Sequence, residues 1–256
     1  MKGQLTIKFF PRTTDRSGFH LKADAPTEHA AVQAFVLQVC ACLEPPDWAA
    51  LLESDPVARS IARDVERAVS IGLSGRYWRA RAFHRGLACP SPEDFGAPQP
   101  GKQPEGRYNP GGARVLYLAS DARTAAAECS GQSASTAVWV QEFALDFPDL
   151  RAIRLDLDLE QLHPHLHYLL LDSEYLPDLA ADFDNVRNPY RATHFLMYLC
   201  GQLGIAGVEY PSIRTGSGEA GHPKNLVLLT HAVPFAELMA IGEPTRPNLG
   251  IATYAV

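Results

Sequence analysis

The chain has 256 residues, of which 46% are hydrophobic and 20% charged, so it can bury a sizeable core as one large domain or as one domain with a small extension. The net charge of −6 argues against a nucleic-acid-binding surface, which usually needs a basic face. The five cysteines form no C-x-x-C pair, which favours a reducing, cytoplasmic setting over a zinc site or a disulfide framework.

Residues 1–71 are predicted to form an N-terminal helical extension. Residues 1–26 are typical of an irregular or weakly β lead-in, and because they lack a long apolar run we expect neither a signal peptide nor a membrane span. A helix follows, with Thr27 as its predicted cap, Glu28 in its first turn and one apolar stripe that runs to Leu43.

Prolines mark the boundaries in the rest of this extension. The pair Pro45-Pro46 ends the first helix, and a short helix is predicted to start at Asp47. Asp55-Pro56 combines a capping side chain with a proline in the first turn, which predicts a second amphipathic helix to about Ser70. The helices at 27–70 could serve as a packed cap, as a dimerisation surface or as a contact for a partner protein.

Residues 72–256 mix short strands with helices and are predicted to form the main domain. A helix is predicted at 122–129, and another starts at Asn188-Pro189 and stops at Gly204. A long loop rich in proline and glycine covers 86–113, and a loop of this length is usually functional or disordered. Few βαβ units are visible, so an α+β fold is favoured over a doubly wound sheet. The predicted strands are 77–83, 115–119, 138–147, 152–157, 205–210 and 225–230, the last being the final core strand.

Three residues in one loop–strand–helix unit could carry chemistry. Arg107 lies in a glycine-flanked loop and could bind phosphate oxygens, although a lone loop arginine is more often solvated. Tyr117 lies mid-strand on the face opposite two leucines, where a half-buried core tyrosine is the alternative. Glu128 follows three alanines in a helix and is either a surface residue or a site carboxylate. Together these side chains would suit a substrate with a phosphate, an aromatic ring and a bond that breaks through a cation, which describes NAD.

Further polar residues support or compete with this unit. Arg79 and Arg81 share a strand face with two aromatic residues and would need an anionic partner if that face is buried. Ser212 follows a proline at a strand end, where it could cap a turn or bind phosphate, and Asn225 could tie the last loop to its strand.

Histidines provide the main rival site. His163, His165 and His167 alternate and could line one face of a strand, but no metal-binding helix motif accompanies them, and we predict no metal site. No dinucleotide-binding glycine motif, P-loop or hydrolase elbow is present in the sequence.

Four short segments in the range 75–232 resemble, in the same order, those of the RES-domain family, which is named for its arginine, glutamate and serine. The segments are Tyr77 to Arg81, Gly106 to Pro110 continuing through Val115 to Tyr117, Thr124 to Glu128, and Gly207 to Ser212 together with Asn225 to Leu228. The resemblance implies an ADP-ribosyltransferase-like split β core with flanking helices, and activity that consumes NAD. It also implies a toxin–antitoxin setting with an Xre-like antitoxin protein as partner.

Site roles follow from the same resemblance. Glu128 would be the catalytic acid, with Arg107 and Tyr117 as further catalytic residues. Arg79, Ser212 and Asn225 would join Arg107 and Tyr117 in binding NAD+, which is a substrate here and not a bound cofactor. The implied activity is an NAD+ glycohydrolase or phosphorylase. The alternatives are a protein ADP-ribosyltransferase and a non-catalytic module that binds a nucleotide or a partner. A homo-oligomer is compatible with the helical extension, and we expect no contact with nucleic acid or membrane.

Overall fold

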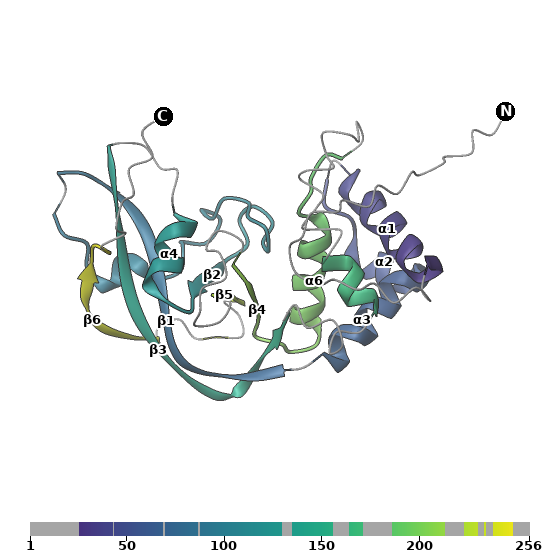
Figure 1. The fold of residues 1–256 in the computed structure, drawn as a ribbon. Helices are drawn as coiled ribbons and strands as arrows, with labels where there is room; N and C mark the ends of the chain where they lie inside the picture. Colours follow the sequence, from purple (N-terminus) through teal and green to yellow (C-terminus); the bar gives the residue numbers. More distant parts are fainter. Residues whose placement is uncertain are drawn as a thin grey trace, which may run out of the picture.

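The computed structural model describes residues 26–42, 44–68, 70–86, 88–129, 135–155, 164–170, 186–212, 223–229, 233 and 238–247. Within these residues a strand-rich part and a helical part lie side by side (Figure 1). The helical part contains α1 (Pro26–Cys40), α2 (Trp48–Ser54), α3 (Pro56–Arg67) and α6 (Arg191–Gln202). The predicted lead-in falls almost wholly outside the described residues.

Side-chain caps fix the starts of the short N-terminal helices. The Asp47 carboxylate accepts a hydrogen bond from Ala50 N at 3.0 Å, and Asp55 accepts from the first two free amides of α3. Both starts are as predicted. The prediction for Thr27 is wrong, because α1 already begins at Pro26 and Thr27 lies inside its first turn. A proline tolerates that first turn because it has no amide hydrogen to leave unbonded.

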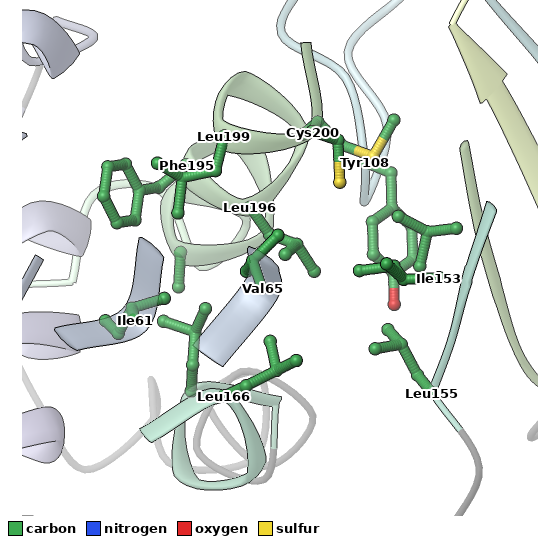
Figure 2. Packing of buried hydrophobic residues seen from close by; sticks show 14 of the residues in the cluster. Ile61, Val65, Tyr108, Ile153, Leu155, Leu166, Phe195, Leu196, Leu199 and Cys200 are labelled. Carbon is green, nitrogen blue, oxygen red and sulfur yellow. The ribbon is translucent and has the colours of Figure 1, made fainter. Parts of the chain in front are cut away.

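Helix α6 lies at the centre of the larger hydrophobic core. Its Phe195, Leu196 and Leu199 are buried, and they face the buried side of α3 in Figure 2, with Tyr108 and Ile153 across from them. The ring of Phe195 also lies 5.3 Å from that of Phe35 in α1. Because α6 is buried on nearly all sides, it joins the N-terminal helices to the sheet in one core. Its predicted stop is confirmed, since Gly204 follows the helix with a φ of +65°.

Within the described residues six strands form one sheet in the order β1-β2-β5-β4-β3-β6. An added pairing between β1 and β3 closes the first five into a ring, and β6 extends the edge of β3. Among these pairings only that of β3 with β4 is parallel. This agrees with the predicted α+β class at the level of a mixed fold, whereas the closer likeness to ADP-ribosyltransferases stays a prediction. The strands are β1 (Ser70–His84), β2 (Val115–Ala119), β3 (Thr136–Arg154), β4 (Gly207–Pro211), β5 (Lys224–Leu229) and β6 (Met239–Thr245).

Three elements differ from the prediction. The strands predicted at 138–147 and 152–157 are one strand, β3, because a register shift opposite Gly72 and Leu73 absorbs the turn-like residues between them. The strand predicted as the last is followed by β6, whose glycine and proline weaken its pattern. Residues 164–170, whose alternating histidines could have lined one face of a strand, are helical. The Asp64 carboxylate accepts from the amides of His165 and Leu166 at the start of that helix.

Alternation along β2 sets up the site. Leu116 and Leu118 point into the smaller core inside the ring of strands, together with Leu226 and Leu228 of β5. Tyr117 points to the opposite face, as predicted, toward the helical side of the sheet.

Candidate functional site

A cavity of about 420 Å³ opens on this outer face of the sheet. Five of the six residues proposed for the site line it: Arg79, Arg107, Tyr117, Glu128 and Asn225. Ser212 lies behind them and contacts Glu128. The structure thus brings together residues from β1, β2, β5, the helix α4 (Ala122–Glu128) and two loops.

The Glu128 carboxylate is held at the end of α4 by two donors, one just after β4 and one on the neighbouring strand β5. Its Oε1 accepts from the Ser212 hydroxyl at 2.9 Å and from Asn225 Nδ2 at 2.8 Å. The helix itself starts at Asp121, whose side chain accepts from Thr124 N, and its buried Ala125 and Ala126 allow close packing on the sheet. Glu128 therefore presents an oriented negative charge at the cavity.

The Tyr117 hydroxyl both donates and accepts a hydrogen bond with the neighbouring loop. It donates to Asn109 Oδ1 at 2.9 Å and accepts from Tyr108 N at 3.0 Å. Burial raises its pKa well above 10, so the side chain stays a neutral phenol. Its ring, and not its hydroxyl, is the part that can face a ligand in the cavity.

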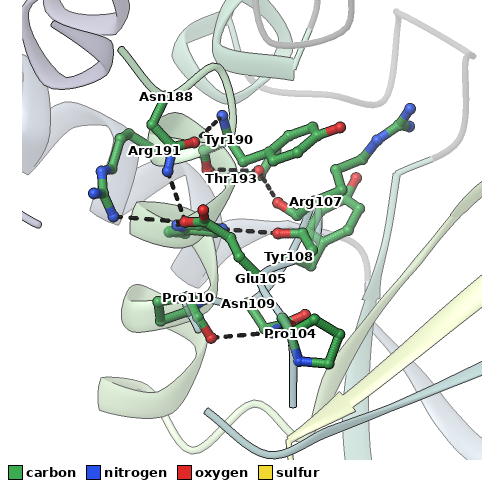
Figure 3. A network of polar contacts seen from close by, with 12 residues as sticks. Pro104, Glu105, Arg107, Tyr108, Asn109, Pro110, Asn188, Tyr190, Arg191 and Thr193 are labelled. Carbon is green, nitrogen blue, oxygen red and sulfur yellow. Dashed lines mark hydrogen bonds and ion pairs between the residues drawn. The ribbon is translucent and has the colours of Figure 1, made fainter. Parts of the chain in front are cut away.

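The main chain of Arg107 is fixed by a hydrogen bond, and its guanidinium lines the cavity. Its carbonyl accepts from the Thr193 hydroxyl of α6. In the part of the chain that the structure describes, the guanidinium has no hydrogen-bond or ion-pair partner, and Figure 3 shows it directed away from the contacts that hold the loop. It is therefore a cation available to a ligand.

Arg79 is half-buried, and part of its guanidinium is already bonded to the protein. Its Nη1 donates to the carbonyls of Phe95 and Gly96 at 3.0 and 2.8 Å, and Arg81 also donates to Gly96. Burial, and then the charge of Arg81, lower the pKa of Arg79 to about 9, which still leaves it protonated at neutral pH. Phe95 is fully buried at the end of the 3-10 turn Pro92–Phe95, so this part of the long loop is firmly attached to β1.

Several cavity residues were not among the predicted site residues. Tyr190 stands just before α6, Tyr210 lies on β4, and Trp78 and Cys129 also line the cavity. The ring of Tyr210 packs 4.5 Å from that of Tyr108, and burial raises the pKa of Tyr210 well above 10. The available signal was the family resemblance, because Tyr210 lies in the matching segment Gly207 to Ser212. Taken alone, an aromatic residue in a strand cannot be distinguished from a core residue.

The histidine alternative is wrong as a strand-based site. His165 Nδ1 lies 3.3 Å from Asp64, and His167 lies on the same short helix, while His163 lies outside the described residues. Nowhere in the described ranges do three or more His, Cys, Asp or Glu side chains gather as metal ligands.

The profile of the RES domain matches residues 76–248 of this sequence, about two thirds of the chain. The chain belongs to the RES-domain family. The matched region starts inside β1, ends beyond β6 and includes α6 together with all six proposed site residues. Helices α1 to α3 precede the RES domain in the sequence and pack on it through α6.

Among solved structures, this chain is similar to a chain in the crystal structure of the MbcT–MbcA toxin–antitoxin complex of M. tuberculosis. The two share 14% sequence identity with a TM-score of 0.46, over 76% of this chain and 95% of that chain. No curated protein sequence matches significantly. In the described residues no helix is both long and apolar enough to cross a bilayer.

Proposed function

We propose that this RES domain cleaves the bond between nicotinamide and ribose in NAD+. The observation that carries the proposal is the Glu128 carboxylate, held by Ser212 and Asn225 at a cavity that also exposes the Arg107 cation and the Tyr117 ring. In one NAD+ molecule, the carboxylate would suit the ribose, the cation the diphosphate and the aromatic ring the nicotinamide. The cavity volume falls in the range usual for small-molecule sites.

The chemistry requires no acid from the protein. As the glycosidic carbon–nitrogen bond breaks, its electron pair moves to the pyridinium nitrogen, and nicotinamide leaves as a neutral molecule. The ribose carbon becomes oxocarbenium-like, as in glycoside hydrolysis. Glu128 would face this developing positive charge and bind the ribose hydroxyls, and such preorganised electrostatic stabilisation is often the largest catalytic contribution.

The remaining residues would position the dinucleotide. Tyr117 would stack on the nicotinamide ring, while Arg107 and the protonated Arg79 would hold the diphosphate or ribose oxygens. Ser212 and Asn225 would act through Glu128, since both donate to its carboxylate. An acceptor then attacks the ribose carbon: water gives ADP-ribose and a proton, phosphate gives the 1-phosphate, and a protein side chain gives an ADP-ribosylated protein.

The proposed biological role is that of a toxin in a toxin–antitoxin pair. Its support is membership of the RES-domain family. Loss of NAD+ would stop growth, and a cognate antitoxin of the Xre-like type would keep the activity in check. Expression in a bacterium should therefore be toxic, and the Glu128→Ala variant should relieve the toxicity.

Nicotinamide release tests the proposed reaction directly. Purified protein is incubated with NAD+ in the presence and absence of inorganic phosphate, and nicotinamide and the ribose product are separated and identified. ADP-ribose in both conditions indicates a glycohydrolase, and a phosphorylated product that requires phosphate indicates a phosphorylase. Labelled protein would indicate a transferase. Absence of nicotinamide in every condition would contradict the proposed function and favour a non-catalytic binding module.

A further inference from the structure

The loop that carries Arg107 is held by α6 and the residues just before it, as well as by Tyr117 of β2. Asn188 Nδ2 donates to Glu105 Oε1 at 2.6 Å, at the start of the loop. Next along the chain, His194 and Thr193 bind the carbonyls of Gly106 and Arg107. Figure 3 shows these contacts as one continuous network between the loop and the helix.

The two α6 side chains nearest Arg107 are almost fully buried. Thr193 and His194 are each 2% exposed. His194 Nε2 lies 2.9 Å from the Gly106 carbonyl oxygen, and because a carbonyl can only accept, Nε2 must carry the hydrogen. The Nδ1 of His194 is buried without a hydrogen-bond partner among the described residues, and burial lowers the pKa of this histidine, so the ring is neutral.

These contacts fix both peptide planes on either side of Arg107. The Gly106 carbonyl belongs to the plane before its Cα, and the Arg107 carbonyl belongs to the plane after it. The second plane is tied again, because Tyr108 N donates to the Tyr117 hydroxyl at 3.0 Å. When both planes are fixed, the φ and ψ of the residue between them are fixed, and so is the direction in which its side chain leaves the backbone.

This arrangement matters because the guanidinium cannot hold itself in place. In the described part of the chain it has no hydrogen-bond or ion-pair partner, so the direction in which the side chain leaves the backbone is an important restraint on where it points. Small displacements of a substrate-binding group can cost a large part of the rate.

We propose that Thr193 and His194 are positioning residues that aim Arg107 at the diphosphate of the dinucleotide. The assignment of the ligand rests on the proposed function. Through these two residues, α6 links the packing of the N-terminal helices to the geometry of the site.

Paired variants separate positioning from simple stability. Thr193→Val and His194→Phe remove the bonds at nearly constant shape, whereas Thr193→Ser and His194→Gln keep a hydroxyl or an N–H at the same place. In nicotinamide release, the first pair should raise KM for NAD+ by roughly tenfold, with a smaller change in kcat. Thr193→Ser and His194→Gln should keep KM close to the wild-type value. A KM that stays at the wild-type value in a folded His194→Phe protein would overturn the proposal.

A double-mutant cycle tests whether His194 acts through Arg107. In an Arg107→Ala background, His194→Phe should cause no further loss of kcat/KM for NAD+, because the residue to be positioned is gone. Losses that simply add would contradict positioning.

Binding of inorganic pyrophosphate, measured by calorimetry on the same proteins, gives a readout independent of turnover. Weaker binding by Thr193→Val and His194→Phe supports positioning even if the wild type releases no nicotinamide. Equal binding by all variants, or no binding by the wild type, counts against it.

Discussion

Glu128 is the residue on which the site depends, and its orientation comes from two residues far away in the sequence. The Ser212 hydroxyl at 2.9 Å is one of the two donors to Oε1. Ser212→Ala should allow the carboxylate to turn, and a lost hydrogen bond to a charged group is worth about 1.5–3 kcal/mol. We expect kcat for nicotinamide release to fall roughly 10- to 100-fold. Ser54→Ala, which removes an exposed hydroxyl on α2, is the matched control. A rate within twofold of wild type in Ser212→Ala would show that Asn225 alone is enough.

Gly106 leaves no room for a side chain beside Tyr117. A Cβ at this position would lie 2.7 Å from Asn109 Oδ1 and 3.0 Å from the Tyr117 hydroxyl oxygen. Gly106→Ala should therefore break the bonds that hold the loop and lower kcat/KM for NAD+ about tenfold or more. Gly111→Ala in the same loop meets open space and should behave like the wild type. Equal activity of the two variants would mean that the loop tolerates the displacement.

At the residue scale the sequence predicted which residues gather, but not how they contact one another. Arg107, Tyr117 and Glu128 were each ambiguous alone, and their order with Arg79, Ser212 and Asn225 supplied the information. The contact of Ser212 with Glu128 joins residues 84 positions apart, and no local spacing encodes such a contact. The contacts of Thr193 and His194 with the loop were not predicted, because buried polar residues in a helix stripe look like ordinary core. Tyr190 was not predicted either, because it precedes the helix stripe and belongs to no predicted motif.

At the scale of elements, α6 depends on the N-terminal helices for part of its cover. Phe35 of α1 is buried against Phe195 of α6, with ring centroids 5.3 Å apart. Phe35→Ala should lower the free energy of unfolding by about 3–5 kcal/mol, because a large cavity is left in the core. Denaturation in urea measures this, with the exposed Gln38→Ala as a control that should change little. A loss below about 1 kcal/mol would indicate that α1 is only loosely packed.

The elements were predicted well where local signals are strong. Capped helices such as α3 and alternating strands such as β2 start and end near their predicted positions. The misses arise from tertiary contacts: the long β3 is continuous only because β1 pairs along it, and β6 forms only at the edge of β3. The helix at 164–170 begins where Asp64 of α3 binds its first amides, a contact between residues about 100 positions apart.

For the whole molecule, one buried and one half-buried histidine predict the dependence of stability on pH. Burial lowers the pKa of both His167 and His194 below the ordinary value of 6.5. The unfolded chain therefore takes up protons at about pH 6.5, while the folded chain does so only at lower pH. The stability from these groups is fully present above pH 6.5 and is lost as pH falls through their folded pKa values.

Urea unfolding at pH 7.5 and pH 5.5 should therefore give a lower free energy of unfolding at pH 5.5. His167→Leu should reduce this difference, because one of the two groups no longer titrates. A free energy that is unchanged or higher at pH 5.5 would contradict the burial of these rings as neutral groups.

The central claim is that the negative charge of Glu128 stabilises the transition state in which the nicotinamide–ribose bond breaks. The Glu128→Gln variant tests the contribution of that charge alone. A glutamine oxygen can still accept from Ser212 and Asn225, so the shape of the site is kept while the charge is removed. The measurement is the kcat for nicotinamide release from NAD+, compared with wild type and with Glu66→Gln, an exposed glutamate on α3. We expect a loss of about 100- to 1000-fold in Glu128→Gln and no loss in Glu66→Gln. Equal release by wild type and Glu128→Gln would contradict the account.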